Sequence, residues 1–266
     1  MEKFQTVLQA ANALKVLGFS VTGLTNPADL YSTIKRLHPI PLKQGLIRCG
    51  PDSDGGYLIP NSLENIQYCF SPGVDTVTGF EQDIYNKFGI KSFLADGSVD
   101  SPCEEKDFMS FSKYYLGYKN NSQYLTLEKW ISNSLPEDSF SDLILQMDIE
   151  GGEYDVIMNC DSATLRRFRI IVIEFHLLHA LEQFPFHFLF ESMISKLLKF
   201  HSVVHIHPNN VGSLIKVGDN LIPSLLEFTF LRKDYVKLGG ELTFPHKLDR
   251  NNAKGNDLVL PKCWWS

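Results

Sequence analysis

Short apolar runs alternate with helical patterns along most of this chain, and each run ends in a polar or glycine-bearing cluster. An apolar run of this length that stops at turn residues is typical of a buried strand. The predicted strands span residues 66–70, 90–95, 108–115, 143–147, 169–175, 202–207 and 225–232. The predicted helices span residues 78–88, 127–135, 153–158 and 181–200. This alternation favours a doubly wound α/β sheet of about seven strands.

The pattern changes at the two ends of the chain. No helical pattern separates the last two predicted strands, which suggests that the final strand runs antiparallel to its neighbours. Residues 1–45 indicate two helices, and Pro39 and Pro41 separate these helices from the predicted sheet. We therefore expect a helical N-terminal segment at 1–45, acting as a cap or in dimerisation, and a sheet domain at 46–266.

Composition narrows the class of protein. A chain of 266 residues suits one α/β domain with an appended segment. The net charge of -6 is spread out without a basic stripe, which argues against a nucleic-acid partner. No apolar run approaches the roughly 20 residues of a membrane span, and the N-terminus lacks the layout of a secretory signal. Dispersed cysteines without a CxxC pair predict a reduced, cytoplasmic protein without a cysteine-based zinc site.

The first two predicted strands end in residues suited to a ligand. Gly73 follows the first strand, where a glycine allows close approach of the backbone to a ligand, and the next helix N-terminus can hold an anionic group. Asp96 lies 23 positions later, where an acidic residue can hydrogen-bond ribose hydroxyls. Together they favour a nucleoside-bearing cofactor. A plain tight turn and a solvated turn aspartate are the simpler alternatives.

Carboxylates follow the fourth predicted strand. Asp148, Glu150 and Glu153 surround a glycine pair at the carboxyl end of residues 143–147, where ligands bind in open α/β sheets. Their functional roles would be metal ligation, contact with a positively charged cofactor centre, or proton transfer. Glu153 is also explained as a first-turn carboxylate that the helix dipole favours.

Histidines end the fifth and sixth predicted strands. His176 follows Glu174 and Phe175, and His205 and His207 alternate with Ile206, so they share one face of their strand. A histidine at this edge can serve as general base or metal ligand. The mixed ligand set that suits Mg²⁺ or Mn²⁺ comprises Asp148, Glu150, His176, His205 and His207.

The segment Met147-Asp148-Ile149-Glu150-Gly151-Gly152-Glu153-Tyr154 resembles the D-x-E-G-x-E segment of FkbM-type S-adenosylmethionine-dependent methyltransferases. Supporting resemblances are residues 173–176, 205–210 and 223–230, and the element formed by Arg48, Gly50 and residues 54–57. The resemblance covers roughly residues 46–260. It implies a class I methyltransferase sheet of seven strands with the last antiparallel, and O-methylation of sugars, glycosides or polysaccharides. The first turn, Ser71-Pro72-Gly73-Val74-Asp75, departs from the Asp and Gly-rich pattern of many members.

On this interpretation we assign roles to the site residues. The predicted cofactor contacts are Gly73, Asp75 and Glu81 at the amino-acid end, Asp96 at the ribose, Asp148 near the methyl centre, and Gly56 ahead of the sheet. His176 is the first choice for general base, with His205 or His207 next. A divalent ion would orient two adjacent sugar hydroxyls and lower the pKa of one.

Two other classes of function fit the sequence. One is a nucleotide-sugar or dinucleotide-binding enzyme, because Gly73 and Asp96 suit any nucleoside cofactor, although a GxGxxG run is missing. The other is a catalytically silent binding module. The expected partners are a small-molecule or glycan substrate and a second copy of the chain in a homodimer.

Overall fold

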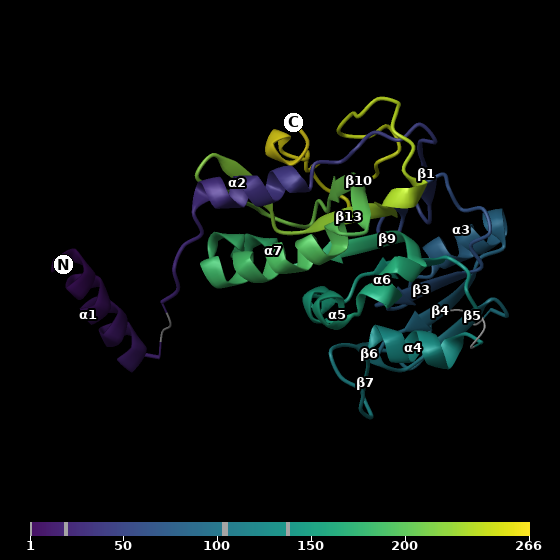
Figure 1. The fold of residues 1–266 in the computed structure, drawn as a ribbon, viewed down its shortest axis with the longest axis horizontal. Coiled ribbons are helices and arrows are strands. Elements are labelled where there is room, and N and C mark those ends of the chain that lie inside the picture. Colours follow the sequence, from purple (N-terminus) through teal and green to yellow (C-terminus); the bar gives the residue numbers. More distant parts are fainter. Residues whose placement is uncertain (1, 19–20, 103–105, 137–138) are drawn as a thin grey trace.

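A seven-stranded sheet forms the centre of the computed structural model, which describes residues 2–18, 21–102, 106–136 and 139–266 (Figure 1). The strand order is β10-β13-β9-β8-β3-β4-β5. Their bounds are β3 Tyr68–Pro72, β4 Lys91–Ala95, β5 Met109–Ser112, β8 Leu143–Met147, β9 Phe168–Phe175, β10 His201–Pro208 and β13 Leu226–Arg232. Strands β5, β4, β3, β8 and β9 pair in parallel, and β13 is antiparallel to both β9 and β10. The predicted doubly wound sheet with an antiparallel last strand is confirmed.

Both faces of this sheet are covered, so its central strands are buried throughout. On β8, Leu143, Leu145 and Met147 pack into one hydrophobic cluster, whereas Ile144 packs into the other. This split follows the period of two along a strand. The larger cluster includes residues of α4 (Leu127–Ser134), α5 (Glu153–Asn159), α6 (Ser162–Arg167) and α7 (Phe184–Leu198). The smaller cluster includes residues of α3 (Gly79–Phe88) and of the hairpin β1 (Leu46–Cys49) and β2 (Tyr57–Pro60).

Helix boundaries differ from the sequence prediction in two places. The long helix expected at 181–200 is split into a 3-10 helix, η1 (Leu178–Glu182), and α7, because Gln183 is extended ahead of Pro185 in the first turn of α7. Helix α6 was not predicted. It is short, and the side chain of Asp161 caps it by accepting from the Thr164 N–H at 2.7 Å.

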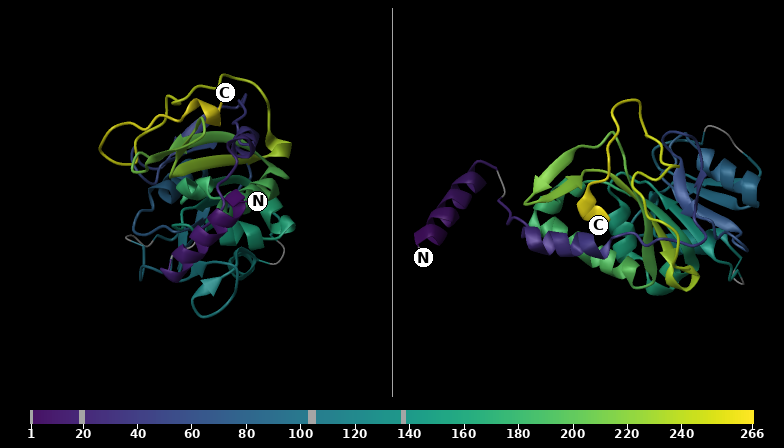
Figure 2. Two further views of the ribbon diagram at one scale, coloured as in Figure 1. Left: turned by 90° about the vertical axis from the view of Figure 1, so that its left-hand side faces the viewer. Right: turned by 90° about the horizontal axis from the view of Figure 1, so that it is seen from above.

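The N-terminal helices occupy different places. Helix α1 (Glu2–Val16) extends away from the body of the molecule (Figure 2), whereas α2 (Pro27–Arg36) packs on it. Leu30, Ile34 and the following Leu37 are fully buried in the larger hydrophobic cluster. The core of the sheet domain therefore includes α2.

Short elements complete the chain. Along the chain, the pair β6 (Tyr115–Leu116) and β7 (Tyr124–Leu125) follows β5. The hairpin β11 (Leu214–Val217) and β12 (Asn220–Pro223) connects β10 to β13 in the sequence. The 3-10 helices η2 (Lys233–Tyr235) and η3 (Lys262–Trp264) flank an irregular C-terminal segment, and Trp264 is buried.

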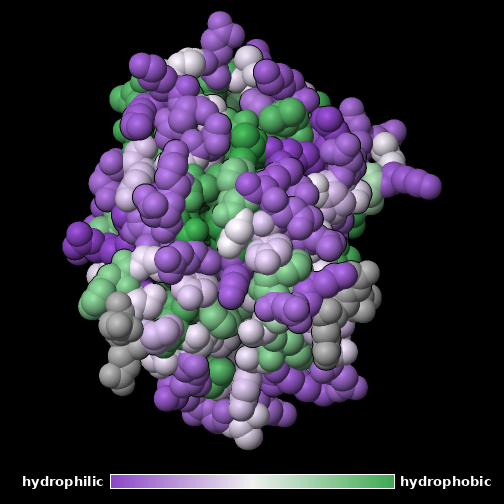
Figure 3. Space-filling view, turned by 90° about the vertical axis from the view of Figure 1, so that its right-hand side faces the viewer, coloured by the Kyte–Doolittle hydropathy of each residue, from purple (hydrophilic) through white to green (hydrophobic). Residues whose placement is uncertain are grey.

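The face at the right of Figure 1 is largely hydrophilic, with apolar residues showing near its centre (Figure 3). Among the described helices, none has the length and apolar character required to cross a bilayer.

Candidate active site

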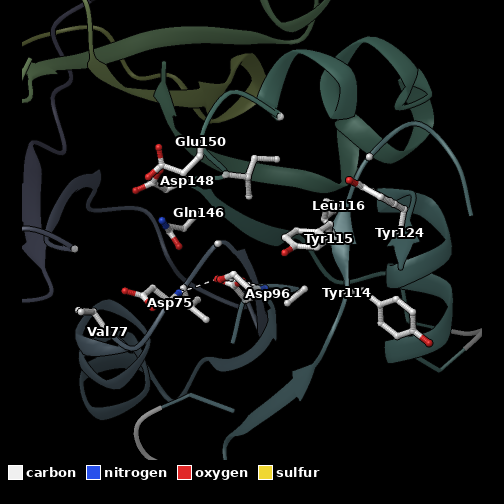
Figure 4. A pocket seen from close by; sticks show the side chains of 18 of the residues that line it. Asp75, Val77, Asp96, Tyr114, Tyr115, Leu116, Tyr124, Gln146, Asp148 and Glu150 are labelled. Carbon is white, nitrogen blue, oxygen red and sulfur yellow. Dashed lines mark hydrogen bonds between the residues drawn. The ribbon is translucent and has the colours of Figure 1, made fainter. Parts of the chain in front are cut away.

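A cavity of about 760 Å³ lies beside the carboxyl ends of β3, β4 and β8 (Figure 4). Its walls come from Asp54, Gly55 and Tyr57, from the turns after the three strands, and from residues 114–119 and Tyr124. Asp148 and Glu150 lie together on one side, and Tyr115, Leu116 and Tyr124 lie on the other. The position agrees with the general location of ligand sites in open α/β sheets.

The turn after β3 is shaped by its contact with β8. Gly73 has a φ of +82°, and a Cβ there would come within 1.6 Å of the Asp148 carbonyl oxygen. A glycine is therefore required by the neighbouring strand as well as by any ligand. Gly73 lines the cavity, as does Asp75.

Asp96 joins the first two turns of the cavity. Its Oδ2 accepts from the Asp75 N–H at 2.9 Å (Figure 4), and its Oδ1 accepts from the Ser98 N–H at 2.8 Å and the Ser98 hydroxyl at 2.6 Å. These donors fix the carboxylate at the cavity wall, where the sequence placed it. Tyr115 lies directly over the same turn, because a Cβ on Gly97 would meet its ring at 2.4 Å.

Glu81 lies at the floor of the cavity and is 2% exposed. The hydroxyl of Ser71 contacts both Glu81 Oε1 and Gln146 Oε1, although it has a single hydrogen to donate. Burial raises the pKa of Glu81. A protonated Glu81 that donates to the Ser71 hydroxyl, which in turn donates to Gln146, satisfies all three groups.

Gly56 does not line the cavity, whereas its neighbours Gly55 and Tyr57 do. A Cβ on Gly56 would lie 2.0 Å from the Pro51 carbonyl oxygen and 2.5 Å from the Arg48 guanidinium. The structure thus gives Gly56 a packing role in the loop before β2.

Glu153 holds the turn after β8. Its Oε1 accepts from the backbone N–H of Ile149 at 3.1 Å and of Gly151 at 3.2 Å, and lies 3.0 Å from His176 Nδ1. The side chain is fully buried. Glu153 is therefore more than a first-turn carboxylate of α5, because it orients the turn and the His176 ring together.

The other ring nitrogen of His176 faces two carboxylates. Nε2 lies 3.3 Å from Glu150 Oε2 and 3.7 Å from Asp148 Oδ1. Asp148 Oδ1 is buried and accepts no hydrogen bond from any described residue. Asp148 and Glu150 line the cavity, whereas His176 lies behind them.

These contacts shift the pKa values of Asp148 and His176. Burial, together with the charges of Glu150 and Glu153, raises the pKa of Asp148 to about 7, although the nearby His176 opposes this. Burial alone would lower the pKa of His176, but Glu153 and the surrounding carboxylates raise it to about 9. At neutral pH His176 is therefore the protonated partner, and Asp148 is the group that titrates.

The five predicted metal ligands do not form one site. Asp148, Glu150 and His176 make one group, and His205, His207 and Asp249 make a second. Within each group, one potential ligand atom of every residue lies within 4.8 Å of those of the other two. Glu174 and Glu227 occupy the strands between them, since Glu227 pairs in register with Glu174 and with His207. A single ion held by all five residues is therefore ruled out by the geometry.

The dividing carboxyl groups are themselves buried. Burial raises the pKa of Glu174 to about 9, with added effects from Glu227 and Asp148, and Asn209 donates to Glu174 at 3.0 Å. Burial also raises the pKa of Glu227, which accepts from Asn252 at 2.6 Å. Both side chains are satisfied within the fold and stand apart from the cavity lining.

Sequence reasoning missed one wall of the cavity and one member of the second histidine and carboxylate group. Tyr114, Tyr115, Tyr118 and Tyr124 all line the cavity, together with Lys119. The available signal was four tyrosines within residues 114–124, beginning at the end of the third predicted strand. Asp249 carried no such signal, because it lies 44 positions after His205 in an irregular segment.

A protein-family model matches the part of the chain that holds most of this site. The model of the Methyltransferase FkbM domain matches residues 118–202, a stretch that contains β8, the turn of Asp148 to Glu153, and His176. The match shows that the chain is a methyltransferase. Within that class, residues 118–202 carry the FkbM domain, so the resemblance of the D-x-E-G-x-E segment is confirmed.

Solved structures that match this chain have low identity to it and low TM-scores. A fibrillarin/Nop5p complex aligns at 10% identity and a TM-score of 0.38, covering 64% of this chain and 74% of that one. Human methyltransferase 10 domain containing protein aligns at 10% identity and a TM-score of 0.35, covering 66% and 75%. A structure titled as the conversion of a disulfide bond into a thioacetal group during echinomycin biosynthesis aligns at 14% identity and a TM-score of 0.29. The alignment covers 64% of this chain and 79% of that one. No curated protein matches the sequence.

Proposed function

We propose that this protein transfers a methyl group from S-adenosylmethionine to a hydroxyl of an uncharged glycan or glycoside. The observation that carries the proposal is the carboxyl group of Asp148. It lies at the cavity wall after β8, its Oδ1 has no hydrogen-bond donor among the described residues, and its pKa is about 7.

The cavity residues fit this cofactor. S-adenosylmethionine, when bound, supplies a methyl group on a positively charged sulfur that an oxygen nucleophile displaces. Asp96 is held with its carboxylate at the wall, ready to accept from ribose hydroxyls, and Gly73 and Asp75 border the place for the amino-acid end. Tyr115 and Tyr124 offer aromatic faces to a flat base. Glu81, whose pKa burial raises, supports the floor of the cavity.

Asp148 suits the role of proton acceptor better than His176, the first choice from sequence. A base is most effective when its pKa lies near the working pH, and Asp148 meets this condition whereas a protonated His176 does not. His176, held by Glu153, acts as a positioning residue that keeps a positive charge behind Asp148.

The charge of the cavity lining limits which class of methyl acceptor fits the site. The described lining has one basic side chain, Lys119. Its acidic side chains are Asp54, Asp75, Glu81, Asp96, Asp148, Glu150 and Asp155. Carboxylates accept hydrogen bonds from hydroxyls and repel phosphates. The balance favours a neutral glycoside or polysaccharide over a nucleotide-linked sugar.

The test has two stages. Calorimetric titration with S-adenosylhomocysteine should show micromolar binding, and methyl transfer from labelled S-adenosylmethionine should occur with neutral glycosides in preference to nucleotide-sugars. Binding without transfer to any acceptor of a broad panel would support a silent binding module. No binding, with heat from NAD or a nucleotide-sugar instead, would support the dinucleotide or nucleotide-sugar alternative.

A divalent-ion variant has its own observation. The ligand atoms of Asp148, Glu150 and His176 lie within 4.8 Å of one another, and Glu153 orients His176 as an outer partner orients a metal-bound histidine. Such an ion would suit two adjacent hydroxyls of an acceptor. Turnover that is lost on chelation and restored by Mg²⁺ or Mn²⁺ would support it, and turnover unaffected by chelation would reject it.

A further inference from the structure

The second histidine and carboxylate group lies on β10 and the C-terminal segment, apart from the methyl-transfer cavity. His205 Nε2 lies 2.8 Å from Asp249 Oδ1, and His207 Nδ1 lies 3.7 Å from the same oxygen. The side chain of His205 is 4% exposed, that of His207 is 12% exposed, and that of Asp249 is 7% exposed. None of the three lines the cavity beside β8.

His207 is the unexplained member of this group. Both of its ring nitrogens are buried, and neither has a hydrogen-bond partner among the described residues. Native structures rarely leave buried polar atoms unsatisfied without a reason. A ligand that is shared with Asp249 and His205 would supply the missing interaction.

The surroundings hold the other two side chains in place. Asp249 Oδ2 accepts from the His246 N–H at 2.7 Å, which directs Oδ1 toward the two histidines. The His205 ring stacks on Phe244, with centroids 5.6 Å apart and planes 12° apart. Such outer contacts orient the ligands of a metal ion before it binds.

We propose that His205, His207 and Asp249 bind Zn²⁺. Two imidazoles and one carboxylate are a common protein ligand set for zinc, and they suit Mg²⁺ or Ca²⁺ poorly because those ions prefer oxygen ligands. His207 and Asp249 border a second cavity of about 310 Å³, which has room for a water molecule as the fourth ligand.

The ion would link the C-terminal segment, through Asp249, to His205 and His207 on β10 of the sheet. Asp249 stands in an irregular stretch, and Asn252 of the same stretch donates to Glu227 on β13 and to Asp54 at the cavity edge. Zinc at Asp249 would therefore stabilise this stretch over the sheet edge. The proposal does not depend on the proposed methyl transfer, because metal content and thermal stability report on it directly.

The experiment uses the full chain without a histidine tag. Bound metal is removed with a chelator, Zn²⁺ is titrated in competition with a chromogenic chelator, and melting temperature is followed with and without Zn²⁺. We expect one Zn²⁺ per chain in the wild type, a rise in melting temperature on adding it, and at least about 100-fold weaker binding in Asp249→Asn.

Matched variants make the result specific. Asp257→Asn makes the same change at another residue of the second cavity and should keep wild-type Zn²⁺ affinity. His207→Gln repeats the test if Asp249→Asn fails to fold, and it should weaken binding to a similar extent. The proposal is overturned if the wild type fails to bind Zn²⁺, if Asp249→Asn and His207→Gln both keep wild-type affinity, or if Asp148→Asn abolishes the binding instead.

Discussion

Two groups of histidine and carboxylate lie on the same polar edge of this sheet, and they differ in their surroundings. Asp148 and Glu150 open onto the large cavity, with His176 behind them, and the Glu150 side chain is 86% exposed. The group of His205, His207 and Asp249 is enclosed, with no side chain more than 12% exposed. In our two proposals, the same residue types therefore serve a reaction site in one place and an ion site in the other.

The electrostatic consequences run in opposite directions. The pKa of Asp148 is raised to about 7, because burial and two acidic neighbours outweigh one histidine. The pKa of Asp249 is held far below its usual value, since hydrogen bonds and charges from His205 and His207 outweigh burial. The pKa values of these two buried acids thus differ because Asp148 has mainly acidic neighbours and Asp249 has two histidines.

The largest expected effect comes from Asp148→Asn. The amide keeps the shape but cannot accept the hydroxyl proton, so we expect kcat to fall about 10³-fold on the best acceptor, with less than a tenfold change in S-adenosylhomocysteine affinity. Turnover of labelled methyl groups and calorimetry measure the two quantities. Asp219→Asn, the same change at an exposed site, is the control. Wild-type turnover in Asp148→Asn would remove it from the reaction.

Gly73→Ala tests the contact that positions Asp148. The new Cβ would meet the Asp148 carbonyl and would also hold a positive φ, so we expect the free energy of unfolding to fall by about 3 kcal/mol. Gly89→Ala is the matched control, because Gly89 has a similar φ of +70° and an open space at its Cβ. Its cost should be about 1 kcal/mol. Equal losses in urea unfolding would show that the Asp148 contact contributes nothing.

The parts of the fold that could be predicted are those that local pattern determines. Apolar runs located all seven strands of the central sheet, and the signal is strongest for β8 and β9, which are buried along their whole length. The division of the histidines could not be predicted. It depends on β13 lying between β9 and β10, and on a residue as remote as Asp249. The orienting role of Glu153 was missed for a related reason, since it rests on His176, 23 positions later.

His201 sharpens the comparison, because it is a buried histidine on β10 without a carboxylate. Burial lowers its pKa to about 4, and one ring nitrogen contacts the Phe168 carbonyl at 2.8 Å. The folded pKa lies below the unfolded value of about 6.5, so the unfolded chain binds the extra proton as pH falls. Stability is therefore lost between pH 6.5 and 4, by about 2 kcal/mol between pH 6.5 and 5.

Urea unfolding at several pH values checks this prediction. The difference in unfolding free energy between the wild type and His201→Asn should shrink as pH falls from 7 to 5, because the variant lacks the titrating ring. A difference that stays constant over this range would mean that His201 does not carry the pH dependence.

The smallest expected effect, about tenfold in kcat, comes from His176→Gln, since His176 acts through Asp148. A purely structural role would leave the pH profile in place. Loss of the positive charge should instead raise the pKa of Asp148 further, because His176 is the neighbour that lowers it. The acid limb of kcat, measured with a chelator present, should then move to higher pH while the KM for S-adenosylmethionine stays within about threefold. A limb that moves to lower pH would mean that His176, and not Asp148, takes up the proton.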